Sequence, residues 1–223
     1  MQQSVYTFLS RFLSPGKIEL FERIVNNRTR QVVLVAEDIY QSQNTSSMLR
    51  SAECYGVQDV YVIENNHSFN VKRRIAKGAA QWLTLHRYCD AMHNSKKCMQ
   101  DLREKGYRIV ATSPHHNALP IDEISLEQKT AIVIGTELTG VSEEILSDAD
   151  EKVFIPMYGF TESLNASVAT AIALYQLRKQ LSCSNIQWQL SEEEKLELKI
   201  VWAKQAVQSG KKLLEMFEAG ELK

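Results

Sequence analysis

The chain has 223 residues, of which 44% are hydrophobic and 24% are charged, and its formal net charge at pH 7 is −1. This length and composition favour one sizeable α/β domain with short helical extensions, and the lack of any apolar run of about 18 residues excludes a membrane-spanning helix. The first residues lack the basic and apolar regions of a secretory signal, and the four cysteines are scattered, so we expect a cytoplasmic protein with reduced thiols.

Two helices are predicted before residue 30, because apolar residues recur there at helical spacing and Pro15-Gly16 interrupts them. Six short apolar runs follow, as is typical of strands buried on both faces of a parallel sheet. The predicted strands are Val32–Val35, Val60–Ile63, Trp82–Leu85, Tyr107–Val110, Ala131–Ile134 and Lys152–Ile155, and the intervening helices are Ser46–Cys54, His93–Glu104, Ser142–Ser147 and Leu164–Leu181. This alternation predicts an α/β fold with a mostly parallel sheet and helices on both faces.

The last part of the chain predicts one long helix. Ser191 and Glu194 form a capping box, and apolar residues from Leu196 to Phe217 recur at helical spacing along one stripe. That stripe has to be buried against the chain itself or against a partner. The sequence therefore divides into a helical N-terminal extension at 1–30, an α/β domain at 31–182 and a C-terminal helix at 190–219.

Charge is segregated along the sequence. Residues 70–110 contain ten Lys or Arg against three Asp or Glu, whereas residues 111–165 contain two against ten. A basic face is therefore compatible with a net charge near zero, although the charges could also mix in space on a solvated surface.

Three polar clusters lie at strand ends, where open parallel sheets bind ligands. In the first, Asn44–Arg50, Asn44 is placed to cap a helix and Arg50 could hold a phosphate through two parallel hydrogen bonds. The second, Gly135–Ser142, allows a sharp turn but matches neither a P-loop nor a dinucleotide-binding fingerprint. The third, Ile155–Ala169, has small polar residues at a helix start. Taken singly, each cluster is better explained as a helix cap or an ordinary turn.

Taken together, in this order and spacing, the clusters resemble the three motifs of the SpoU/TrmH branch of the SPOUT superfamily of RNA ribose 2′-O-methyltransferases. The resemblance extends from about Val32 to Leu181. The matching positions are Asn44, Arg50 and Gly56, then Gly135, Glu137, Gly140 and Ser142, then Ile155, Gly159, Ser163, Asn165 and Ser167.

The resemblance implies a C-terminal trefoil knot and a homodimer whose active site lies at the subunit interface. It implies S-adenosylmethionine as the cofactor and RNA as the substrate. The helical extensions favour tRNA, for example a D-loop guanosine, over rRNA. The alternatives are an rRNA 2′-O-methyltransferase of the same family and a catalytically silent RNA-binding dimer.

The resemblance also assigns roles to single residues. Arg50 would bind the phosphate beside the target, and Arg50 or that phosphate would take the proton of the ribose hydroxyl. Because a protonated arginine is a very weak base, we expect its main contribution to be stabilisation of the developing alkoxide. Asn44 would orient Arg50 or the ribose, and Glu137 would hold Asn44 or the motif loops by hydrogen bonds. Ser163 and Asn165 would position the substrate and the loop. The expected cofactor contacts are Thr112, Gly135, Ile155 and Leu164.

A basic segment is the remaining candidate for RNA binding. Besides Arg50, we expect Lys72, Arg73 and Arg74 of the run that ends at Lys77 to contact RNA phosphates, and the alternative is a solvated helix face. We expect no metal site, because His115-His116 has no third ligand at a recognisable spacing.

Overall fold

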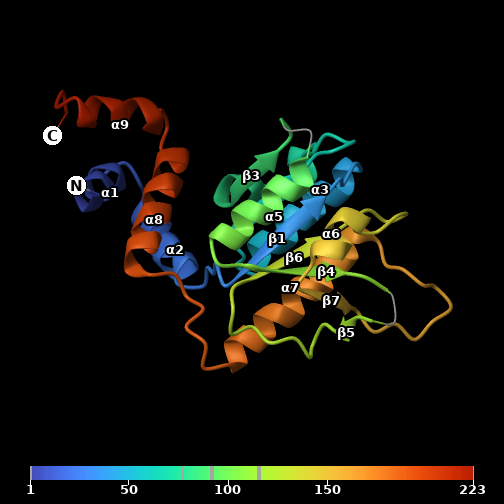
Figure 1. Cartoon of the computed structure of the whole chain (residues 1–223). Coiled ribbons are helices and arrows are strands. Elements are labelled where there is room, and N and C mark those ends of the chain that lie inside the picture. The colour runs from blue at the N-terminus through green and yellow to red at the C-terminus, as the bar shows by residue number, and fades with distance from the viewer. Residues whose placement is uncertain (1, 77, 91–92, 115–116, 223) are drawn as a thin grey trace. The chain divides into compact units, whose positions relative to one another are not determined.

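A computed structural model describes residues 2–76, 78–90, 93–114 and 117–222 (Figure 1). The chain divides into two compact units. One is formed by residues 30–188, and the other by residues 1–29 together with 189–223. Among the described residues, no helix combines the length and the apolar character that a membrane crossing requires.

The unit of residues 30–188 is built on a parallel sheet, as predicted. Its strands are β1 (Val32–Glu37), β2 (Asp59–Ile63), β3 (Thr84–Tyr88), β4 (Arg108–Thr112), β5 (Leu119–Pro120), β6 (Thr130–Ile134) and β7 (Glu151–Phe154). Their order is β3-β2-β1-β6-β4-β7-β5, and every neighbouring pair is parallel. The sequence predicts six strands; the additional one, β5, is a two-residue edge strand that contains a proline, so no apolar run marks it.

Helices cover both faces of this sheet, which confirms the prediction. They are α3 (Ser42–Cys54), α4 (Arg73–Ala76), the 3₁₀ helix η1 (Ala79–Trp82), α5 (Asn94–Glu104), α6 (Glu143–Asp148) and α7 (Ala166–Cys183). Val32 and Leu34 of β1 pack in one core with residues of α3 and α7. Val33 and Val35 pack in a second core with residues of α5 and α6. Alternate side chains of the central strand therefore anchor helices on opposite faces.

The third predicted strand is displaced along the chain. Trp82 ends η1 instead of starting a strand, and β3 extends to Tyr88. The polar residues His86 and Arg87 lie within β3. Since β3 is at the edge of the sheet and its residues are half-buried or exposed, its sequence is less apolar than that of the central strands.

The other unit contains four helices among its described residues: α1 (Gln2–Ser10), α2 (Pro15–Val25), α8 (Glu192–Ala206) and α9 (Gly210–Glu218). The predicted capping box at Ser191 is present. Phe21 packs edge-on against the buried Trp202, with ring centroids 5.6 Å apart. Phe8 of α1 stacks on Phe217 of α9 at 4.4 Å. The apolar stripe of the C-terminal segment is thus packed against the N-terminal helices.

The prediction of one long C-terminal helix is wrong. The helix stops at Ala206, and Ser209 adopts a left-handed conformation with φ 58° before α9 begins. Gly210 makes the corner possible, because a Cβ there would lie 2.3 Å from the carbonyl oxygen of Lys204. The apolar spacing continues across the corner, so periodicity alone does not mark the break.

Candidate active site

Asn44, Glu137 and Asn165 form a hydrogen-bonded ring at the carboxyl-terminal edge of the sheet. The Asn44 amide Nδ2 donates to Glu137 Oε1 at 2.7 Å. The Asn165 amide Nδ2 donates to Asn44 Oδ1 at 3.1 Å and also to Glu137 Oε1. Asn44 is buried, Glu137 is half-buried and Asn165 is exposed. The ring joins the three sequence clusters, and it contains the hydrogen bond expected between Glu137 and Asn44.

Asn165 is the N-cap residue of α7, which begins two residues after the start of the predicted helix Leu164–Leu181. Its Oδ1 accepts from the backbone N–H groups of Ser167 at 2.9 Å and Val168 at 3.3 Å, and from Ser167 Oγ at 2.6 Å. The oxygen of this amide therefore stabilises the helix start, and its nitrogen holds the ring.

Asn44 does not cap a helix, contrary to the prediction. Helix α3 starts at Ser42, so Asn44 lies inside its first turn, and Gln41 occupies the N-cap position without a side-chain cap bond. Asn44 Nδ2 also donates to Gln41 Oε1, at 3.2 Å. The apolar pattern marks a start four residues later than the observed one, because the first residues of the helix are polar and give no apolar signal. Its other end is as expected, with Gly56 in the left-handed region at φ 75°.

The Gly135–Gly140 loop is closed on itself. Backbone hydrogen bonds of 3.0 and 3.1 Å link Thr136 and Gly140 in both directions. A Cβ on Gly135 would lie 2.0 Å from the Gly140 carbonyl oxygen, so only glycine fits at this position. Gly140 has φ +69°, which also favours glycine. After the loop, Ser142 caps α6 by accepting from the backbone N–H of Ile145.

The expected cofactor residues follow neighbouring strands. Thr112 ends β4, Gly135 follows β6 and Ile155 follows β7, and β4 lies between the other two strands. Thr112 Oγ1 donates to the carbonyl oxygen of Val133 at 2.9 Å, close to the start of the glycine loop. Leu164, just before the cap of α7, is half-buried, and the adjacent Ser163 is exposed. All of these residues lie at one edge of the sheet, because the strands are parallel.

Arg50 lies apart from the ring. It is exposed, and among the described residues no hydrogen bond or ion pair involves its side chain. Six residues of α-helix separate it from Asn44, which corresponds to about 9 Å along the axis and about 120° around it. Asn44 and Arg50 thus occupy different faces of α3, and the expected orientation of Arg50 by Asn44 is not seen within one chain.

Arg50 lies instead on the face of α3 that contacts the basic segment. Ser46, one turn before Arg50, accepts from the backbone N–H of Lys72 at 2.8 Å, and Thr45 Oγ1 donates to the Asn70 carbonyl oxygen. The side chains of Lys72 and Arg74 are exposed. Lys77, His115 and His116 lie outside the described residues, as does the side chain of Arg73.

Glu37 is a buried carboxylate that sequence reasoning missed. It ends β1 and is 3% exposed, and it accepts hydrogen bonds from Ser95 and Ser142. The available signal is an acidic residue directly after the five apolar residues Val32–Ala36, at the carboxyl end of a buried strand. Acids are rarely buried without partners, so this position indicates a polar network there.

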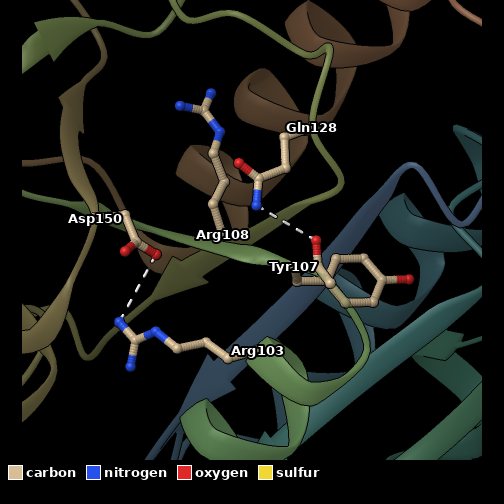
Figure 2. Close-up of a pocket in the computed structure, with 6 residues that line it drawn as sticks. Arg103, Tyr107, Arg108, Gln128 and Asp150 are labelled. Atoms are coloured by element: carbon tan, nitrogen blue, oxygen red, sulfur yellow. Dashed lines mark hydrogen bonds and ion pairs between the residues drawn. The ribbon is translucent and has the colours of Figure 1, made fainter.

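A cavity of about 420 Å³ lies at the opposite edge of the sheet (Figure 2). Three of its lining residues are charged. Arg103 lies at the end of α5, Arg108 starts β4 and Asp150 directly precedes β7. Arg103 pairs with Asp148 and Asp150, and Arg108 pairs with Glu151 at 2.7 Å. Because both guanidinium groups already have carboxylate partners, neither arginine offers an unpaired charge to a ligand.

The comparisons with known proteins agree on one family. The chain matches the SpoU rRNA Methylase family over residues 31–175. It is 40% identical to the tRNA (guanosine(18)-2'-O)-methyltransferase of Borreliella burgdorferi, over 90% of each chain. The A. aeolicus TrmH/SpoU tRNA modifying enzyme has the same fold, with a TM-score of 0.77 and 27% identity over 86% of this chain and 98% of that one.

A further fold likeness is to the SpoU methyltransferase AviRb of Streptomyces viridochromogenes, solved in complex with the cofactor AdoMet. Its TM-score is 0.62 at 24% identity, over 73% of this chain and 65% of that one. The family match over most of the chain coincides with the unit that carries the Asn44–Glu137–Asn165 ring. This chain therefore belongs to the SpoU rRNA Methylase family.

Proposed function

We propose that this chain transfers the methyl group of S-adenosylmethionine to a ribose 2′-hydroxyl of tRNA, at guanosine 18. The observation that carries the proposal is the ring of Asn44, Glu137 and Asn165, which joins all three family motifs. The Borreliella burgdorferi relative, whose name specifies tRNA and guanosine 18, aligns over 201 residues, so the likeness extends beyond the α/β unit. This activity would place the chain in the cytoplasm with its tRNA substrate.

The edge of the sheet that carries the ring suits S-adenosylmethionine. The loops after β4, β6 and β7 offer backbone N–H and C=O groups beside Thr112, Gly135 and Ile155, and Leu164 adds an apolar side chain. Glu137 Oε2 has no donor among the described residues and could accept from a ribose hydroxyl. When bound, the cofactor supplies a methyl group on a positively charged sulfur, which is already electrophilic.

The chain itself has to orient the nucleophile and stabilise its charge. A ribose hydroxyl attacks more readily as its proton leaves, and the RNA phosphate beside the target, or Arg50, takes that proton. Arg50 binds the neighbouring phosphate and stabilises the developing alkoxide electrostatically. The ring holds the motif loops at a fixed separation, so that the ribose oxygen is kept in line with the methyl group. Ser163 positions the substrate at the start of α7.

We further propose a knotted homodimer whose active site is completed at the interface. Arg50 and the ring lie on different faces of α3, which supports a site shared between two copies. Helix α7 exposes Val168, Ile172 and Tyr175 along one face. Such a stripe is typical of a surface that a partner covers. We expect the trefoil knot at the C-terminal end of the α/β unit.

Methyl transfer to defined RNAs tests the activity. With tritium-labelled S-adenosylmethionine, a tRNA transcript should accept one methyl group, whereas the same transcript with a 2′-deoxy residue at position 18 should accept none. Transfer to rRNA fragments but not to tRNA would replace the proposed substrate by rRNA. Binding of tRNA without transfer to any RNA would leave a catalytically silent RNA-binding dimer.

Sedimentation of two matched variants tests the dimer. Ile172→Glu places a charge on the exposed stripe of α7 and should give monomers. Val201→Glu, at an exposed valine of α8, should leave the wild-type state. If both variants sediment like the wild type, α7 is not the interface.

A mixture of two inactive variants tests whether Arg50 acts across that interface. Co-expressed Arg50→Ala and Glu137→Ala chains should regain about a quarter of wild-type activity, because half of randomly paired dimers are mixed and each mixed dimer has one complete site. Recovery is expected only if Arg50 serves the ring of the other copy. No recovery would place Arg50 and the ring of one chain in the same site.

A further inference from the structure

Glu37 holds the start of α6 through a buried network. Its Oε1 accepts from Ser142 Oγ at 2.6 Å and from Ser95 Oγ at 3.0 Å, and its Oε2 accepts from the Ser142 backbone N–H at 2.9 Å. With a side chain that is 3% exposed, the carboxylate depends on these donors to offset its burial. Hydrogen bonds to a charged acceptor are also stronger than those between neutral groups.

Two consecutive residues of β1 fix the two ends of the glycine loop. Ala36 pairs with Ile134, the residue before Gly135. Glu37 binds Ser142, which follows the loop after one intervening residue. The loop therefore starts and ends against the same strand, at the centre of the sheet.

We infer that Glu37 is a positioning residue for S-adenosylmethionine binding, because it fixes the far end of the Gly135–Gly140 loop. This inference rests on the proposed function. Without the Ser142 contact, the loop would keep its attachment to β6 but lose its attachment after Gly140. A looser loop would bind the cofactor more weakly without any direct contact having been removed.

The two serines provide a matched pair for the test. Ser142→Ala and Ser95→Ala each remove one hydroxyl donor from the same oxygen of Glu37, but only Ser142 lies directly after the loop, whereas Ser95 is in α5. Glu37→Leu removes all three hydrogen bonds that Glu37 accepts. Glu37→Gln is the conservative variant, because the glutamine carbonyl can accept from the Ser142 backbone N–H and the glutamine amide can donate to the two serine hydroxyls.

Hydrogen exchange of the backbone amides of Thr136 and Gly140 reports the loop without any cofactor. Both amides are hydrogen-bonded across the loop and should exchange slowly in the wild type. We expect about tenfold faster exchange in Glu37→Leu and a smaller increase in Ser142→Ala. Wild-type rates are expected in Ser95→Ala, and Glu37→Gln should recover part of the protection. Equal rates in the two serine variants would overturn the inference, even if Glu37→Leu fails to fold.

Calorimetric titration with S-adenosylmethionine adds the functional readout. Affinity should fall about tenfold in Glu37→Leu and stay unchanged in Ser95→Ala. If the wild type binds and Ser142→Ala binds equally well, Glu37 has a purely structural role. If the wild type does not bind S-adenosylmethionine, the proposed function fails, and the exchange rates still decide whether Glu37 fixes the loop.

Discussion

Replacing Asn165 by aspartate separates its two tasks. In Asn165→Asp, a carboxylate oxygen can still accept from the backbone N–H groups of Ser167 and Val168, so the cap of α7 is retained. The donor that links the ring is lost, and two carboxylates then face each other, because Asn165 Nδ2 lies within hydrogen-bond distance of Glu137 Oε1. Asn165→Ala removes both the cap and the link.

The magnitudes follow from these contacts. Loss of an N-cap side chain costs about 1 kcal/mol of stability, so Asn165→Ala should be less stable than Asn165→Asp by about that amount at low pH, where protonation removes the repulsion between the carboxylates. Two unit charges about 4 Å apart repel by about 4 kcal/mol at an effective dielectric constant of about 20. Because Asn165 is exposed and Glu137 is half-buried, water reduces the repulsion to about 1–2 kcal/mol.

The repulsion gives Asn165→Asp a pH dependence beyond any that the wild type has. A proton shared between the two carboxylates removes the repulsion, and a lower pH favours that protonated pair. That proton supplies a donor between the two side chains and restores one link of the ring. The activity of Asn165→Asp relative to wild type should therefore be low at pH 8 and rise as the pH falls.

Urea denaturation and tRNA methylation, each measured at two pH values, check these expectations. The variant Asn165→Ala serves as the control, because its relative activity should stay low at both pH values. Wild-type turnover of Asn165→Asp at pH 8 would show that the ring is not required. At the lower pH, where the repulsion is absent, equal destabilisation of the two variants would refute the capping role.

Three further changes address the loop, the arginine and the basic segment. Gly135→Ala should abolish S-adenosylmethionine binding in a calorimetric titration, because its Cβ would overlap the loop backbone, whereas Gly140→Ala has open space and should cost about 1 kcal/mol of stability for its positive φ. Arg50→Lys keeps the charge but loses the planar fork, so kcat should fall strongly while cofactor affinity stays near wild type; unchanged kcat would remove Arg50 from the chemistry. Neutral glutamines at Lys72 and Arg74 should flatten the salt dependence of tRNA binding in filter assays by up to about two units of log–log slope, and an unchanged slope would exclude both side chains from RNA contact.

The central strands and the three polar clusters could be predicted from the sequence because their signals are local. Val32–Ala36 is a continuous apolar run, and it is buried on both faces of the sheet. Asn165 lies at the start of the predicted helix Leu164–Leu181, and it caps α7. These features depend on a few adjacent residues, and packing does not override them.

Other features depend on contacts that no local pattern contains. The corner at Gly210 is set by the approach of the Lys204 carbonyl, and the apolar spacing on either side of it is continuous. Asn44 lies inside α3, on a different face from Arg50, because the helix begins at Ser42. The first turn of the helix is polar, so the apolar pattern does not reveal this start. The role of Glu37 requires Ser142, 105 positions away, as its partner.

The helical unit also constrains when the protein can finish folding. Its first two helices leave the ribosome before the α/β unit of residues 30–188, and their partners α8 and α9 leave after it. At about 5–20 residues per second, the intervening segment takes about 10–30 s to synthesise. During that time Phe8 and Phe21 lack the aromatic partners Phe217 and Trp202 that they contact in the folded unit. The nascent helices α1 and α2 therefore expose apolar surface while the α/β unit is synthesised, which makes them the segment where we expect a chaperone to bind.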